Sequence, residues 1–199
     1  MGNSFMTSHF DPRQTLRRQL RQSRRNLSSE EQLKAADSLI HSYNEILEQL
    51  TIQPPKRVAL YLSNDGEISP HLLCEYFWQQ QIETYLPVVQ GKQLTFACYS
   101  SATIWQENQF GIKEPLTSEY VAGNELDIVL LPLVGFDSKG GRLGMGGGFY
   151  DRTFENKRAD QKPLLIGLAH DCQEVKSLPV EGWDVPLQAI ITPTKSIKV

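Results

Sequence analysis

Residues 141–152, which read GRLGMGGGFYDR, carry side chains suited to binding a phosphate chain. Four glycines, at positions 144 and 146–148, stand between an arginine and an aspartate. They let backbone N–H groups converge on an anion, because no Cβ blocks the approach of a ligand. Arg142 could clamp phosphate oxygens, and Asp151 offers the hard oxygen ligand that Mg²⁺ prefers. The loop is not a Walker motif, since no GK[ST] follows, and a tight strand-to-helix turn would also explain its glycines.

A second candidate is the segment 13–25, which holds six arginines and no acidic residue on a background that favours helix. Arg13 and Arg17 are one helical turn apart, so both could reach one polyanion. The segment could be a solvated helix face, a phosphate ligand or an RNA contact, and its residues alone leave the three alternatives open. The other arginines spread around the helix: Arg18, Arg21, Arg24 and Arg25.

Carboxylates and aromatic residues at predicted strand ends and in a long loop could contact a heterocycle. Glu67 follows an apolar strand and could accept hydrogen bonds from ring N–H groups, or could simply lie near a helix start. Glu114 is similarly placed in a loop. Trp105 and Phe110 could stack on a planar ring, although aromatic residues in loops often only pin the loop to the core.

Two further residues stand near the last predicted strands. Asp184, in the segment EGWDVPL, could share a magnesium ion with Asp151, although their separation in the sequence leaves this pairing open. His170 follows a strand end and could be a general base, or a packed or capping histidine.

The bulk composition limits the class of protein. The chain has 199 residues, 40% of them hydrophobic and 22% charged, which is typical of a globular protein with a buried core. The net charge of −3 argues against general nucleic-acid binding. Three widely spaced cysteines suggest neither a disulfide framework nor a zinc site. No stretch is long and apolar enough to span a bilayer. We therefore expect a cytoplasmic protein, with neither membrane nor nucleic acid as a partner, and a monomer.

The elements that must position these residues alternate between helix and strand. Apolar residues spaced by three and four predict a helix after a cap at Ser28 or Ser29, and a second helix is predicted over 70–81. Residues 104–125 are expected to be mostly loop. Apolar strands alternating with helices predict one three-layer, Rossmann-like α/β domain over 11–199, with a mostly parallel sheet, helices on both faces and an N-terminal helical arm. Residues 1–10 are expected to be flexible. The predicted strands cover 57–63, 84–89, 94–99, 128–134, 164–169 and 189–192.

These pieces, in this order, resemble the 5-formyltetrahydrofolate cyclo-ligase family, over about residues 13–192. The resemblance rests on Leu16-Arg17 in the basic helix, YLSxxxE from Tyr61 to Glu67, GIKEP, EGWDVPL and a terminal IITP. Its most specific part is the block LLPLVGFDSKGGRLGMGGGFYDR. It implies an enzyme that converts 5-formyltetrahydrofolate to 5,10-methenyltetrahydrofolate, with ATP as co-substrate and Mg²⁺ as cofactor.

The resemblance also implies roles for individual residues. Arg142 and Asp151 would be catalytic, and Asp151 and Asp184 would hold magnesium. Folate would contact Leu62, Glu67, Trp105 and the loop residues Met145, Gly146, Gly147, Gly148 and Phe149. ATP would contact Arg13, Gln14, Thr15, Leu16, Arg17, Arg142, Leu143, Gly144, Met145, Gly146, Gly147, Gly148, Phe149 and Tyr150.

Two positions depart from the pattern of the family. Arg13 stands where lysine is frequent, which preserves the charge but changes the donor geometry. Phe149 stands where tyrosine is common, so a hydroxyl contact from this position is lost. A folate- or nucleotide-binding module without catalysis, and an RNA-binding protein that uses the arginine helix, are the alternative functions.

Overall fold

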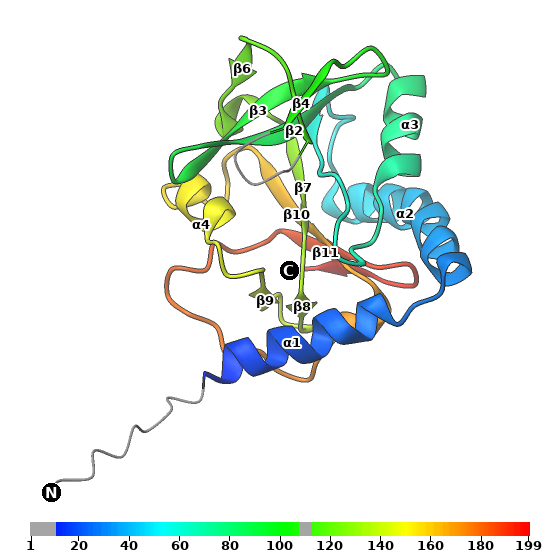
Figure 1. Ribbon diagram of the computed structural model, residues 1–199, viewed down its shortest axis with the longest axis vertical. Helices are drawn as coiled ribbons and strands as arrows, with labels where there is room; N and C mark the ends of the chain where they lie inside the picture. The colour runs from blue at the N-terminus through cyan, green and yellow to red at the C-terminus, as the bar shows by residue number, and fades with distance from the viewer. Residues whose placement is uncertain (1–10, 108–112) are drawn as a thin grey trace, which may run out of the picture.

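The computed structural model describes residues 11–107 and 113–199. Its centre is a sheet of eight strands in the order β12-β11-β10-β7-β1-β2-β3-β6 (Figure 1). The five strands from β11 to β2 run parallel, β12 and β3 pair antiparallel with the outer two of them, and β6 pairs antiparallel with β3. The strands of this sheet are β1 (Arg57–Ala59), β2 (Glu83–Gln90), β3 (Gln93–Tyr99), β6 (Tyr120–Val121), β7 (Ile128–Pro132), β10 (Leu164–Leu168), β11 (Ala189–Ile191) and β12 (Ser196–Lys198).

Helices α2 (Ser29–Leu50) and α3 (His71–Gln79) cover one face of the sheet (Figure 1). A capping box at Ser28 begins α2, because the Ser28 side chain accepts from the Glu31 N–H and the Glu31 side chain accepts from the Ser28 N–H. The apolar stripe of α2 packs on the alternate strand residues that point to this face. The largest core cluster forms here, with Leu39, Ile46, Phe77, Val58, Leu130 and Ile166 among its members.

The opposite face carries the short helix α4 (Phe149–Phe154) and the 3₁₀ turn Gly123–Glu125. Phe154 of α4 packs near Phe96, with 6.3 Å between ring centroids. The intervening strand residues, such as Leu131, Leu165 and Ile190, bury their side chains in this second cluster. The expected three-layer α/β arrangement with a mostly parallel sheet and helices on both faces is confirmed.

Helix α1 (Pro12–Arg25) is the N-terminal arm, and it lies across the ends of the strands beside a small hairpin (Figure 1). The hairpin consists of β8 (Gly135–Phe136) and β9 (Arg142–Leu143). Leu20 of α1 packs with Val134 and Leu143. A Cβ at Gly135 would lie 2.4 Å from Leu20 Cδ1, so this close approach requires glycine. The arm is therefore a packed part of the fold.

The structure corrects several predicted boundaries. Strand β1 ends at Ala59 rather than at residue 63, and β7 ends at Pro132, after which the chain leaves the sheet. The region 104–125, expected to be mostly loop, contains β4 (Trp105–Glu107), β5 (Lys113–Pro115), β6 and the 3₁₀ turn. Strand β12 was also not predicted. The expected flexibility of residues 1–10 lies outside the described residues. Within the described part of the chain, no helix is long and apolar enough to cross a membrane.

Candidate active site

A cavity of about 940 Å³ opens at the carboxyl end of β7, where open parallel sheets place their ligands. Four segments distant in the sequence surround it: α1, the glycine loop between β9 and α4, α4 itself, and the loop 181–186. Pro87, Val89 and Leu94 of the β2–β3 hairpin add an apolar wall. The cavity therefore joins the predicted glycine loop to the first part of the arginine helix.

The glycine loop has a backbone shape that other residues would strain. Gly146 has φ +99° and Gly148 has φ +64°, both in the left-handed region. A Cβ at Gly148 would also lie 2.7 Å from Arg152 Nη1. Arg152 Nη2 donates to the Gly147 carbonyl at 2.7 Å, and the guanidinium lies 5.1 Å from the ring centroid of Phe149. The loop is thus held in a defined conformation from the side of α4.

Arg142 and Asp151 form a nearly buried ion pair at the wall of the cavity. The Arg142 guanidinium also donates from Nε to the Val185 carbonyl at 3.0 Å, and the residue is 6% exposed. The Val185 N–H donates to Asp151 Oδ1 at 3.1 Å. Both candidate catalytic residues are therefore fixed against the loop 181–186.

Arg13 and Asp184 form a second ion pair at the same cavity. The guanidinium donates two parallel hydrogen bonds, Nη1 to Oδ2 at 3.0 Å and Nη2 to Oδ1 at 3.1 Å. The neighbouring Glu181 N–H donates to Asp184 Oδ2 at 2.9 Å. Asp184 directly precedes Val185, whose N–H donates to Asp151, and both aspartates line the large cavity.

Arg17 connects α1 to the glycine loop. Its Nε donates to the Gly144 carbonyl at 2.9 Å. A Cβ added at Gly146 would lie 3.5 Å from Arg17 Cζ, so the guanidinium lies against this part of the loop. Met145 completes the contact between the helix and the loop. The structure thus brings Arg13, Arg17, Arg142 and the loop to one cavity, as the phosphate-binding hypothesis expects.

Three of the other arginines of α1, namely Arg21, Arg24 and Arg25, form an ion cluster around one aspartate, whereas Arg18 is exposed. Asp65, in the turn after β1, accepts from Arg21 Nε at 2.6 Å and from Arg24 Nη2 at 2.9 Å, and it pairs with Arg25. Burial raises the pKa of Asp65, but the hydrogen bonds from the three arginines outweigh it and lower the pKa to about 2. Sequence reasoning did not identify Asp65, although six arginines on one helix call for a nearby acid.

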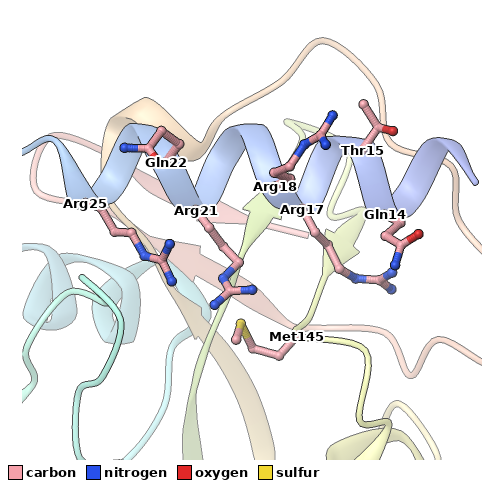
Figure 2. A pocket seen from close by; sticks show the side chains of 8 residues that line it. All are labelled: Gln14, Thr15, Arg17, Arg18, Arg21, Gln22, Arg25 and Met145. Carbon is pink, nitrogen blue, oxygen red and sulfur yellow. The ribbon is translucent and has the colours of Figure 1, made fainter.

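A smaller cavity of about 550 Å³ lies along this arginine face of α1 (Figure 2). Arg17, Arg21 and Arg25 point toward the side where Met145 lies. Gln14 and Thr15 line this smaller cavity, not the larger one. Leu16 packs against the cluster around Leu20. Leu143 is fully buried in the same cluster, so Leu16 and Leu143 line neither cavity. The other residues expected to bind ATP are divided between two cavities that share Arg17 and Met145.

Of the described residues expected to contact folate, those of the glycine loop, 145–149, line the large cavity, whereas Glu67, Leu62 and Trp105 do not. Glu67 Oε2 accepts from the Asn64 N–H at 3.1 Å, and burial raises its pKa. Leu62 is 40% exposed, and Trp105 packs on Tyr99 with ring centroids 5.7 Å apart. Tyr150 lines the cavity, and burial, followed by the charge of Glu67, raises its pKa.

The structure decides between the alternatives for His170 and shows what the sequence reasoning missed. His170 is 2% exposed and is not among the residues that line either cavity, which fits a packed histidine; burial also lowers its pKa to about 4. Glu114, placed only in a loop by the sequence, is buried at the cavity wall. Trp183 and Lys157 line the cavity and were not predicted, although Trp183 lies in the motif EGWDVPL. Phe110 lies outside the described residues.

The fold and the cavity define an α/β protein with a ligand site at the carboxyl edge of a parallel sheet, ringed by arginines and carboxylates. The model of the 5-formyltetrahydrofolate cyclo-ligase family matches residues 10–193. The chain belongs to this family of ligases.

Relatives and solved structures agree with this assignment. The chain is 44% identical over 184 residues to a 5-formyltetrahydrofolate cyclo-ligase of Haemophilus influenzae, with 90% of this chain and 96% of that protein covered. It is 38% identical over 185 residues to that of Escherichia coli, with coverage of 88% and 97%. The solution structure of a 5,10-methenyltetrahydrofolate synthetase of Aquifex aeolicus superimposes with a TM-score of 0.71 at 30% identity, covering 94% of this chain and 92% of that one.

Proposed function

We propose that this ligase uses ATP to close the ring of 5-formyltetrahydrofolate, giving 5,10-methenyltetrahydrofolate, ADP and phosphate. One observation carries the proposal beyond family membership: Arg13, Arg17 and Arg142 converge on one cavity whose floor is the glycine loop. Its volume of about 940 Å³ lies in the upper range for small-molecule sites, as two substrates side by side require.

The reaction needs positioning and charge neutralisation more than covalent chemistry from the protein. The formyl oxygen is a poor leaving group, so the γ-phosphoryl group of ATP is transferred to it and ADP leaves. The neighbouring anilino nitrogen, N10, then attacks the formyl carbon, its N–H proton is released, and phosphate departs with the oxygen. Arg142 would stabilise the negative charge on the transferring group, and Arg13 and Arg17 would hold the other phosphates.

We infer that Asp151 and Asp184 would hold Mg²⁺ with the phosphates of ATP. The donor set fits this ion, which usually binds one or two protein carboxylates together with substrate phosphates. Both hydrogen bonds to Asp151 fall on Oδ1 among the described residues. No group of three or more His, Cys, Asp or Glu side chains that could form a closed metal cage occurs in the described ranges. Magnesium would supply further charge neutralisation at the phosphates.

The folate would lie between the glycine loop and the turn after β1. We infer that Glu67 accepts hydrogen bonds from the ring N–H groups and that Leu62 and Trp105 contact the apolar parts of the substrate. The Arg24 guanidinium lies 3.8 Å from Met145 Sδ and 3.6 Å from Glu67 Oε1. This common neighbour supports a site shared by Met145 and Glu67. Phe149 would pack on the folate without donating a hydrogen bond.

We also infer a cytoplasmic monomer that binds no nucleic acid. Its three cysteines, Cys74, Cys98 and Cys172, are free, which suits a reducing compartment. The arginines of α1 that would be needed to contact RNA are largely engaged by Asp65.

The experiment is to mix the protein with 5-formyltetrahydrofolate, ATP and Mg²⁺ and to follow the absorbance of the methenyl product. Product is expected only when all components are present, with one ADP released for each folate cyclised. Binding of either substrate without turnover would favour a binding module. Binding to RNA that weakens steeply with salt, in the absence of turnover, would favour the RNA-binding alternative.

A further inference from the structure

Arg24 is a fully buried guanidinium near the end of α1, with 0% of its surface exposed. Its Nε donates to the Asp65 carbonyl at 2.9 Å, Nη1 to the Leu133 carbonyl at 3.1 Å and Nη2 to Asp65 Oδ2 at 2.9 Å. Burying a guanidinium is unfavourable unless its donors are paired, and all three donor positions of Arg24 are paired. This fixed fork therefore ties α1 to the turn after β1 and to the end of β7.

The same guanidinium approaches two residues expected to bind folate. Arg24 Nη2 lies 3.6 Å from Glu67 Oε1 and 3.8 Å from Met145 Sδ. Glu67 belongs to the turn after β1, whereas Met145 belongs to the glycine loop after β9. One buried group thus contacts both sides of the proposed folate site.

Helix α1 is bound to each of these segments by further contacts, which makes it a rigid spacer between them. Gln32 Nε2 donates to the carbonyls of Arg24 and Gly66 at 3.2 and 3.4 Å. Gly66 has φ +73°, and a Cβ there would lie 3.2 Å from the Arg24 carbonyl oxygen. On the other side, Arg17 binds the Gly144 carbonyl. A change of the Arg24 side chain would therefore act on the side chains of Glu67 and Met145, which it contacts, rather than on the backbone of α1.

Arg24 also influences the charge of Glu67. Burial raises the pKa of Glu67, and the positive charge of Arg24 opposes that rise. The groups that face Glu67 are the N–H of Asn64, the charges of Arg24, Arg21 and Asp65, and the phenols of Tyr61 and Tyr150.

We propose that Arg24 is a positioning residue for the reaction, which holds the Glu67 carboxylate and Met145 at the separation that the folate ring requires. It touches no substrate itself. This inference rests on the proposed function, because it assigns Arg24 to the folate side of that site. A merely structural Arg24 would affect stability, or both substrates alike, and would leave the pH dependence of folate use unchanged.

The test compares Arg24→Lys and Arg24→Gln with a control at a surface arginine, Arg158→Gln. Arg158 pairs with Asp160, its side chain is 72% exposed, and it lines neither cavity. Lysine keeps the charge but lacks the planar fork. We expect Arg24→Lys to raise KM for 5-formyltetrahydrofolate about tenfold and KM for ATP less than about twofold, with Arg158→Gln changing neither by more than about twofold.

The pH dependence supplies a second readout. In Arg24→Gln, the low-pH limb of kcat/KM for folate should move to higher pH, because Glu67 loses its positive neighbour. Arg24→Lys should leave this limb near the wild-type position. Equal changes in both KM values, or an unmoved limb in Arg24→Gln, would overturn the proposal.

If the Arg24 variants fail to fold, Asp65→Asn gives the same test. It removes the carboxylate that fixes Nη2 while keeping the backbone acceptors, and it too should raise KM for folate selectively. A folded Asp65→Asn variant with wild-type KM for folate would refute the positioning role. Failure of the wild-type protein to convert 5-formyltetrahydrofolate would instead overturn the proposed function itself.

Discussion

Asp151→Asn tests whether the aspartate between Arg142 and Val185 acts through its charge. The carboxylate pairs with Arg142 and accepts from the Val185 N–H at 3.1 Å. The amide is nearly the same size and can keep one acceptor oxygen toward both donors. The substitution therefore removes the negative charge and leaves the local packing in place.

The structure permits an estimate of the cost to stability. Arg142 is 6% exposed and keeps its bond to the Val185 carbonyl, and the Asp151 side chain is 19% exposed. A hydrogen bond to a charged group contributes about 1.5–3 kcal/mol, of which the amide retains part, so we expect a loss of about 1–2 kcal/mol. For a chain of this length, this corresponds to a decrease in Tm of about 2–8 °C. The variant should therefore remain folded at room temperature.

The expected effect on catalysis is much larger. If Asp151 holds magnesium beside the transferring phosphoryl group, its loss should lower kcat at least about a hundredfold, or about 2.7 kcal/mol of transition-state stabilisation. The assay measures methenyl product against Mg²⁺ concentration, with Tm measured on the same sample. Asp160→Asn is the matched control, because Asp160 pairs with Arg158 at the surface, and it should change neither quantity. Wild-type turnover by Asp151→Asn at saturating Mg²⁺ would refute the assignment.

Two other substitutions address the arginine helix and the buried histidine. Arg17→Ala removes the hydrogen bond to the Gly144 carbonyl and a proposed phosphate ligand. In initial-rate measurements, KM for ATP should therefore rise several-fold more than KM for folate, and equal changes in the two values would contradict this role. Burial, and secondarily the charge of Arg24, lower the pKa of His170 to about 4 in the folded state, below its unfolded value of about 6.5. The unfolded state therefore takes up a proton first as the pH falls, so the free energy of unfolding is highest above pH 6.5 and decreases between pH 6.5 and pH 4. The wild type should therefore lose about 2 kcal/mol of unfolding free energy between pH 7 and pH 5 from this group, which His170→Gln should not lose in urea unfolding; identical losses in both proteins would show that another group is responsible.

The fold class could be predicted because hydrophobic spacing and helix caps are set by residues within a single helix or strand. The apolar spacing of α2 and the capping box at Ser28 mark that helix, and continuous apolar runs mark β7 and β10. Short elements whose pairing depends on distant residues were not predictable. Strand β12 forms only because β11 offers an open edge, and the β4–β5 pair joins two segments of a region with few apolar residues.

The glycine loop could be predicted from the sequence because its residues are contiguous. The ion pairs around it could not, since they join residues far apart in the chain, such as Arg13 with Asp184 and Arg24 with Asp65. Burial of Arg24 was also unpredictable, because six arginines on one helix look alike until their partners are known. The sequence also left open whether Asp151 and Asp184 meet, and the structure places both at the lining of one cavity, with Val185, the neighbour of Asp184, donating to Asp151.

The two ion pairs at the cavity explain how one site can hold both strong cations and the carboxylates proposed to bind metal. Arg13 neutralises Asp184 and Arg142 neutralises Asp151, so the four groups carry no net charge together. Buried or half-buried charges are tolerated when they are paired in this way. At the proposed site, phosphates would offer each arginine a new anionic partner, and the cation that accompanies ATP would offer each aspartate a new cationic one. Binding of both would therefore exchange one set of ion pairs for another. Removal of either partner from a pair should then impair folding less than it impairs ATP use.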